Sequence, residues 1–258
     1  MARPRKAKAP PRGFVVYDGP SMLTGEPIVC IATLHSTNRK TGDMVQTWVL
    51  LQAMDPIAGN RTGADVSICG YCDSRGTARP EAETGLADGR ACYVDLGRSP
   101  LGIWRAWKRG IYPVAQGHAA IAAVGHGRAV RLGAYGDPAA IPDYVNESLV
   151  SEASGHTAYS HQLDWAGATG FDASRMMVSA DSLAGAQRAW DSGARTFRVV
   201  GAVADVVRER EVLCPASEEA GKRTQCARCL LCGGSSVKAK SIAIVVHGAG
   251  KRHHRAAA

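Results

Sequence analysis

The stretch MMVSADSLAGAQRAWDSGARTFRVV, residues 176–200, decides the fold class of this chain. Residues 176–180 and 196–200 each indicate a short strand. Between them, residues 182–190 indicate a helix, with Asp181 as the expected N-cap and Gly193 as the stop. A strand, a helix and a second strand in this order predict a βαβ unit with parallel strands.

The alternation of helices and strands extends on both sides of this unit. A helix is predicted from the expected cap Ser99, through Pro100, to Arg109, and another over residues 142–154. Strands are predicted over residues 130–132, 157–161 and 241–246. Residues 27–35 and 45–52 predict an N-terminal β-hairpin around the turn residues 38–43. We therefore expect an α/β fold, as a partial or complete (β/α) barrel or as an open sheet.

The 258 residues predict a single domain, residues 13–250, between two basic tails. Residues 1–12 contain five basic residues, three Pro and no acid, and we expect them to be disordered. Residues 251–258 begin with Lys-Arg-His-His-Arg, and the formal net charge of the chain is +8. Basic tails suit a polyanion such as DNA or RNA. A purely solubilising role is the alternative.

The sequence also bears on location. It has no run of about 18 apolar residues, so neither a transmembrane helix nor a membrane partner is expected. The basic N-terminal residues are not followed by an apolar segment, so no secretory signal is expected. We therefore expect a cytoplasmic protein, in which thiols stay reduced and grouped cysteines bind metal. A disulfide framework is the alternative.

The strongest chemical signal is a C-x11-C-x2-C-x2-C pattern within residues 214–234. Each C-x2-C turn directs two thiolates to one centre, and a distant fourth cysteine completes a zinc site or anchors an iron–sulfur cluster. The Gly233-Gly234 pair lets the backbone leave this knuckle. The four residues, called here the second cysteine group, are Cys214, Cys226, Cys229 and Cys232.

A first cysteine group, Cys69, Cys72 and Cys92, lies in the polar, glycine-rich insert 60–98. Three thiolates could hold an iron–sulfur cluster with one open iron, or zinc with a fourth ligand from elsewhere. Structural zinc is the simpler interpretation of either group, and spacing does not decide between the metals. Bound metal would explain how so long and polar a segment stays ordered.

Polar side chains are predicted at the carboxyl ends of the strands, where parallel α/β folds bind ligands. Asp137 and Asp181 each follow a strand and could act as nucleophile and general base, with His161 as a general acid or a phosphate contact. Helix capping is the alternative for both carboxylates, and a structural role is the alternative for His161. The candidate substrate-binding residues on the same rim are Tyr135, Tyr159, Gln162, Ser179 and Arg198.

The order of these motifs resembles phage proteins of the gene-product-88 type and, more loosely, phage proteins that look like incomplete radical-SAM barrels. The resemblance spans roughly residues 60–250 and is carried by Cys92-Tyr93 and Gly136-Asp137. It implies a 4Fe-4S cluster, with S-adenosylmethionine as a second cofactor. The chain lacks the C-x3-C-x2-C triad of ordinary radical-SAM enzymes.

The sequence also resembles the DpdA-type DNA-guanine transglycosylases of phages, which are similar to tRNA-guanine transglycosylases. The motif Ser179-Ala180-Asp181-Ser182 is similar to the Ser-x-Asp-Ser of that family. The resemblance implies a barrel, a base-contacting aspartate at Asp181 with Asp137 as its partner, and a structural zinc site late in the chain. The cysteine spacing here differs from that of the family, and the chain is short for an eight-stranded barrel.

Three functions are therefore expected as alternatives. The first is exchange of guanine in DNA, or in RNA, for a 7-deazaguanine base, as phages do in host cytoplasm for protection from restriction; it needs only zinc. The second is an iron–sulfur, radical-SAM-like enzyme with the first cysteine group around the active iron. The third is a zinc-knuckle DNA-binding or replication accessory protein without catalysis.

Overall fold

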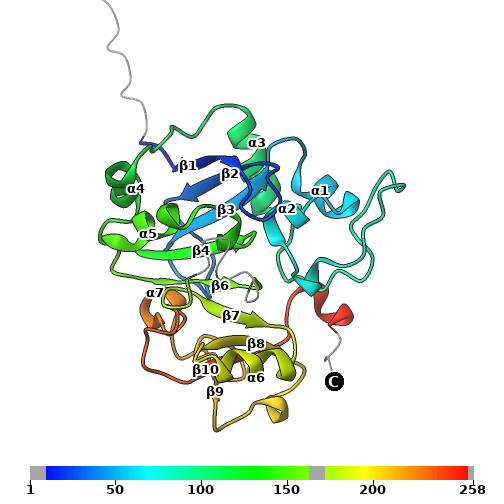
Figure 1. Ribbon diagram of the computed structural model, residues 1–258, viewed down its shortest axis with the longest axis vertical. Helices are drawn as coiled ribbons and strands as arrows, with labels where there is room; N and C mark the ends of the chain where they lie inside the picture. The colour runs from blue at the N-terminus through cyan, green and yellow to red at the C-terminus, as the bar shows by residue number, and fades with distance from the viewer. Residues whose placement is uncertain (1–9, 163–171, 255–258) are drawn as a thin grey trace, which may run out of the picture.

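The computed structural model describes residues 10–162 and 172–254, which form a mixed α/β fold with two five-stranded sheets (Figure 1). The strand order is β1-β2-β3-β4-β5 in the first sheet and β6-β7-β8-β10-β9 in the second. The expected α/β class is confirmed at this level. Most of the predicted basic tails, residues 1–9 and 255–258, lie outside the described residues.

The first sheet contains the predicted hairpin. Strands β2 (Pro27–Thr33) and β3 (Val45–Leu51) pair antiparallel, with Cys30 opposite Val49. Strand β1 (Gly13–Pro20) adds an antiparallel edge that the sequence analysis missed, while β4 (Ala129–Tyr135) and β5 (Gly155–Thr157) continue on the other side in parallel. Apolar β-branched runs bury both faces of β2 and β3. Cys30 is core, as expected, and burial raises the pKa of its thiol to about 12.

The second sheet is entirely parallel and contains the βαβ unit of residues 176–200. Its strands are β6 (Tyr159–Ser160), β7 (Met177–Ala180), β8 (Thr196–Val200), β9 (Glu211–Leu213) and β10 (Ser241–Val245). Helix α6 (Leu183–Asp191) joins β7 to β8, as predicted. The three-residue β9 was not predicted, because so short a segment has no recognisable period.

The expected cap of α6 was wrong by one residue. Ser182 has the extended backbone of an N-cap, and its hydroxyl accepts a hydrogen bond from the Gly185 amide at 3.0 Å. The Asp181 carboxylate is therefore not committed to the helix terminus.

The predicted strand over residues 157–161 is divided at Ala158 between the two sheets. Its first part is β5 and its second part is β6. The Ala158 amide donates to the Cys232 carbonyl, and its own carbonyl accepts from the Met177 amide, both at 3.0 Å. One short segment thus connects the first sheet, the second sheet and the second cysteine group.

The helices partly match prediction. Helix α3 (Ser99–Lys108) begins at Ser99, with Arg98 rather than Ser99 as its N-cap, and α5 (Asp143–Ser151) follows Pro142. Helix α4 (His118–Gly125) was missed, since its alanine-rich sequence has no side-chain cap. The short helices α1 (Pro56–Thr62), α2 (Val66–Cys69) and α7 (Cys226–Cys229) belong to the cysteine-rich parts of the chain. None of the described helices is long and apolar enough to cross a membrane.

Helices α4 and α5 approach each other closely at a glycine. A Cβ atom added to Gly125 would lie 2.0 Å from the Leu149 carbonyl oxygen. We expect Gly125→Ala to lower the free energy of unfolding by about 1–3 kcal/mol, because backbone must move to relieve the overlap. Urea denaturation followed by circular dichroism measures the change.

Gly102→Ala in α3 is the matched control, because its Cβ would meet no described atom within 4 Å. We expect it to be neutral or to stabilise by up to about 1 kcal/mol, since Ala is the better helix former. Equal stabilities for the two variants would contradict this account of the α4–α5 contact.

Candidate active site and metal-binding cavity

A cavity of about 420 Å³ is lined by residues from both sheets. Tyr135 on β4, Tyr159 on β6 and Ser179 on β7 contribute to its wall. Seven of the eight cysteines also line it, all except Cys30. The two cysteine groups, separated by more than a hundred residues in sequence, therefore face one common space.

The structure brings together the three residues predicted to react at the strand ends. Asp137 follows β4, His161 follows β6 and Asp181 follows β7, and all three line the cavity. His161 Nε2 lies 3.4 Å from Asp181 Oδ1, and His161 Nδ1 lies 4.0 Å from Asp137 Oδ2. The imidazole thus stands between the two carboxylates.

The Asp137 carboxylate is almost fully used by the fold. Its Oδ1 accepts from the Ala139 amide at 2.9 Å, which is the capping role considered for it. Its Oδ2 accepts from the His161 amide at 2.8 Å and from Gln162 Nε2 at 3.2 Å. The side chain is only 3% exposed. These contacts suit a positioning residue better than a nucleophile.

Asp181 and His161 form the accessible polar pair of the cavity. The Asp181 side chain is 32% exposed. Burial lowers the pKa of His161, but the Cys72 thiol and the Asp181 carboxylate outweigh it, so that the pKa lies well above its usual value. The raised pKa lets the His161 imidazole hold a proton beside Asp181 in this cavity.

The first cysteine group comes from α2 and the loop that follows it. Burial raises the pKa of Cys69 and Cys92, and repulsion from the neighbouring thiol of Cys72 raises both further. Gly70, with φ +56°, lets the chain turn beside Gln162, whose side chain would lie 2.3 Å from an added Cβ. Gln162 donates to the Cys69 carbonyl at 3.1 Å, so it holds this loop rather than lining the cavity.

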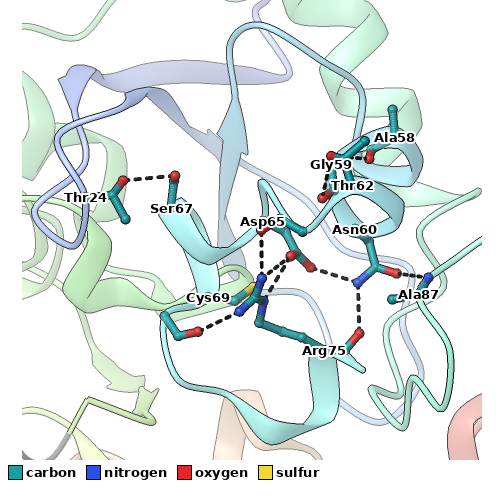
Figure 2. A network of polar contacts seen from close by, with 12 residues as sticks. Thr24, Ala58, Gly59, Asn60, Thr62, Asp65, Ser67, Cys69, Arg75 and Ala87 are labelled. Atoms are coloured by element: carbon teal, nitrogen blue, oxygen red, sulfur yellow. Dashed lines mark hydrogen bonds and ion pairs between the residues drawn. The ribbon is translucent and has the colours of Figure 1, made fainter. Parts of the chain in front are cut away.

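A polar network, shown in Figure 2, orders the segment that carries the first group. Arg75 Nε and Nη2 donate to Asp65 Oδ1 at 2.9 and 2.6 Å, and further Arg75 bonds reach the Gly63 and Gly70 carbonyls. Asn60 donates to Asp65 Oδ2 at 2.8 Å and accepts from the Ala87 amide. Bound metal was the expected explanation for the order of this segment, and the network provides an explanation within the protein.

Breaking this network tests its contribution. The Asp65 side chain is 4% exposed, so Asp65→Ala leaves a largely buried guanidinium without its partner. We expect the free energy of unfolding to fall by about 3–5 kcal/mol. Urea denaturation measures the global loss, and limited proteolysis measures local opening of residues 60–98.

Asp88→Ala is the control from the same segment. Its ion pair with Arg79 spans 3.4 Å, and its side chain is 71% exposed. Such a pair contributes at most about 1 kcal/mol. A similar small loss for both variants would mean that the Asp65–Arg75 pair does not hold the segment.

The second cysteine group is held against the loop before β3. Within and beside α7, the Cys226 amide donates to the Lys40 carbonyl at 3.1 Å, and Leu230, with φ +52°, turns the chain back. Burial raises the pKa of the Cys232 thiol to about 12, although a hydrogen bond from Tyr159 opposes this shift. Tyr159 also packs on Phe197, with ring centroids 4.4 Å apart.

The remaining predicted residues have different positions. Tyr135 and Ser179 line the cavity, and the Tyr135 hydroxyl is buried with no hydrogen-bond partner in the described part of the chain. Arg198 does not line it. Its guanidinium is buried in an ion pair with Glu211 at 2.6 Å and donates to the Asp205 carbonyl. This placement corrects the expected substrate contact, because the fold already uses the charge of Arg198.

Sequence reasoning missed the four Lys and Arg residues that line the cavity, Lys40, Arg75, Arg90 and Arg131. Arg131 lies in the middle of the predicted strand 130–132, where a charged residue between Val130 and Leu132 is a usable signal. Lys40 lies in the turn between the hairpin strands, where basic residues are common, so the sequence gives no signal for it. The hydrogen bond from the Cys226 amide to its carbonyl is what brings it to the cavity.

Within residues 10–162 and 172–254, no three His, Cys, Asp or Glu side chains converge closely enough to hold a metal ion as they stand. The prediction of metal binding therefore rests on the chemistry of the seven thiols and on their common cavity. Comparisons with protein-family models, with curated proteins and with solved structures find no match to this chain.

Proposed function

We propose that this protein is an enzyme that modifies nucleic acid and uses an iron–sulfur cluster held by Cys69, Cys72 and Cys92. The observation that carries the proposal is that these three thiols line the same cavity as the Asp181–His161 pair. A purely structural zinc site is closed by four protein ligands and needs no access to a reactive pair. The placement of the first cysteine group beside reactive side chains instead favours a chemical role.

The donor set fits such a cluster. Three cysteines would supply soft thiolate ligands, and because the first group has no fourth cysteine, one metal position would be left for a ligand such as S-adenosylmethionine. When bound, the cluster would supply electron transfer to a ligand at that open position. The second cysteine group has four thiols, which fit zinc or a second cluster.

The chain's own residues have separate tasks in this proposal. Asp137 holds the His161 backbone through its amide, and the imidazole contacts Asp181. His161 and Asp181 then hold or move a proton at the substrate. Tyr135 offers a buried hydroxyl that can bind a polar substrate atom. We also propose that the two sheets together form the expected partial barrel. The hydrogen bonds of Ala158, which lies between β5 and β6, support this arrangement.

A second candidate is exchange of guanine in DNA for a 7-deazaguanine base, with zinc in the second cysteine group. It is favoured by the exposed carboxylate of Asp181 beside His161. Asp181 attacks the sugar C1′, the bond to guanine N9 breaks, and His161 donates a proton to the departing base. The deazapurine then gives its N9 proton to His161 and displaces Asp181 from C1′.

Metal analysis decides between the candidates. In anaerobically purified protein we expect iron, sulfide and a visible thiolate-to-iron absorption band, because the proposal assigns a cluster to the three thiols of the first group. Cys72→Ser should lose the iron of that group. Cys30→Ala, the control in the core of β2, should keep it. Zinc without iron or a visible band would overturn the iron–sulfur proposal and leave base exchange as the candidate.

Asp181→Asn tests the reactive pair under either candidate. We expect turnover to fall by about 10²–10⁴-fold, the usual effect of removing an acid–base group. The readout is incorporation of labelled base into DNA, or consumption of S-adenosylmethionine in the presence of DNA. Asp191→Asn, on the exposed face of α6, is the control and should keep full activity. Unchanged turnover in Asp181→Asn would remove this carboxylate from the mechanism.

A further inference from the structure

Arg131 brings to the cavity a positive charge that no carboxylate in the described residues pairs with. Its side chain starts from β4, and Nη2 donates to the Tyr93 hydroxyl at 2.6 Å. Its Nε is buried and has no hydrogen-bond partner among the described residues. In the same part of the chain, no carboxylate forms an ion pair with Arg131, and the groups that interact with it are tyrosines and thiols.

A second cation reaches the same space from another element. Lys40 lines the same cavity as Arg131, from the turn between β2 and β3, and the thiols of Cys214 and Cys226 line it as well. Its Nζ lies 3.3 Å from His247 Nε2, and no carboxylate within the described residues is at ion-pair distance from it. Two like charges in one cavity repel each other, and an anion bound between them would offset that repulsion.

The positive charge continues to the surface. A groove of about 840 Å³ shares Asn38, Lys40 and His247 with the cavity. Its other basic residues are Arg39, Lys222, Arg223 and Arg228. Two acids, Glu218 and Glu219, also line it, and Glu218 is paired with Lys222 at 2.6 Å. The groove is therefore a mainly basic path that leads to Lys40 and Arg131.

We propose that Arg131 and Lys40 bind a phosphate group of the substrate, and that the basic groove receives the phosphates next to it in a single-stranded polynucleotide. A guanidinium fork suits phosphate, and a row of basic residues suits the regular charge of a nucleic-acid backbone better than a single carboxylate. The cavity volume fits one nucleotide rather than a duplex, so the reactive base leaves its stack. The polynucleotide part rests on the proposed function.

Fluorescence anisotropy with a labelled single-stranded oligonucleotide tests the proposal on the full-length protein with its metal retained. We expect Arg131→Gln to weaken binding about tenfold or more, the effect of losing a charge-assisted bond. Lys40→Gln should act in the same direction. Arg228→Ala should weaken binding less. It should also make the negative slope of log affinity against log salt shallower by about 1, because one phosphate contact is lost. Arg188→Ala, on the exposed face of α6, is the control and should bind as the unmodified chain does.

Two further measurements separate the possible failures. Metal content and thermal melting of each variant show whether Arg131 stabilises the metal-binding thiolates instead of binding phosphate. Loss of metal from Arg131→Gln with unchanged oligonucleotide affinity would overturn the proposal. So would unchanged affinity in both Arg131→Gln and Lys40→Gln.

The protein could also bind a nucleoside 5′-monophosphate through Arg131 and Lys40 but bind no oligonucleotide. That result would support the phosphate site and overturn both the role of the groove and the proposed action on nucleic acid. If the purified protein contains no iron but Arg131→Gln still weakens oligonucleotide binding, the phosphate-binding proposal is supported and the iron–sulfur proposal is overturned.

Discussion

The buried carboxylate of Asp137 is the interaction on which the arrangement of the site depends. One oxygen holds the turn after β4, and the other holds the His161 amide and the Gln162 side chain at the end of β6. The Asp137 amide also donates to the Ile68 carbonyl in α2, next to Cys69. Losing a hydrogen-bond partner of a buried polar group is costly, so these bonds fix the groups that make them. This group therefore joins both sheets to the first cysteine group.

The division of one strand at Ala158 has a similar consequence for the second cysteine group. Because the Ala158 amide bonds to the Cys232 carbonyl, the knuckle is attached where the two sheets meet. The Cys226 amide bonds to the loop before β3 and holds the other side of the knuckle. These backbone contacts leave the thiols directed to the cavity, where they meet residues from β4, β6 and β8.

The charge distribution of the cavity connects its two proposed properties. The Cys232 thiol, whose pKa burial raises to about 12, interacts with Arg131, a cation that has no carboxylate partner in the described residues. Metal-bound thiolates and a bound phosphate would each add negative charge to this space. The Asp65–Arg75 network, in contrast, is already neutral and already complete, which suits a part of the protein that supports the site without reacting.

Local sequence alone determined several elements. The apolar runs and turn residues predict the hairpin β2–β3, and the strand–helix–strand pattern of residues 176–200 predicts β7, α6 and β8, because periodicity and capping act over a few residues. Cysteine spacing likewise defines each group by itself. Only the tertiary structure decided that both groups share a cavity, that Ser182 and not Asp181 caps α6, and that Arg198 pairs with Glu211. These outcomes depend on contacts between distant residues, and no local pattern encodes which of several chemically suitable partners the packing brings within reach.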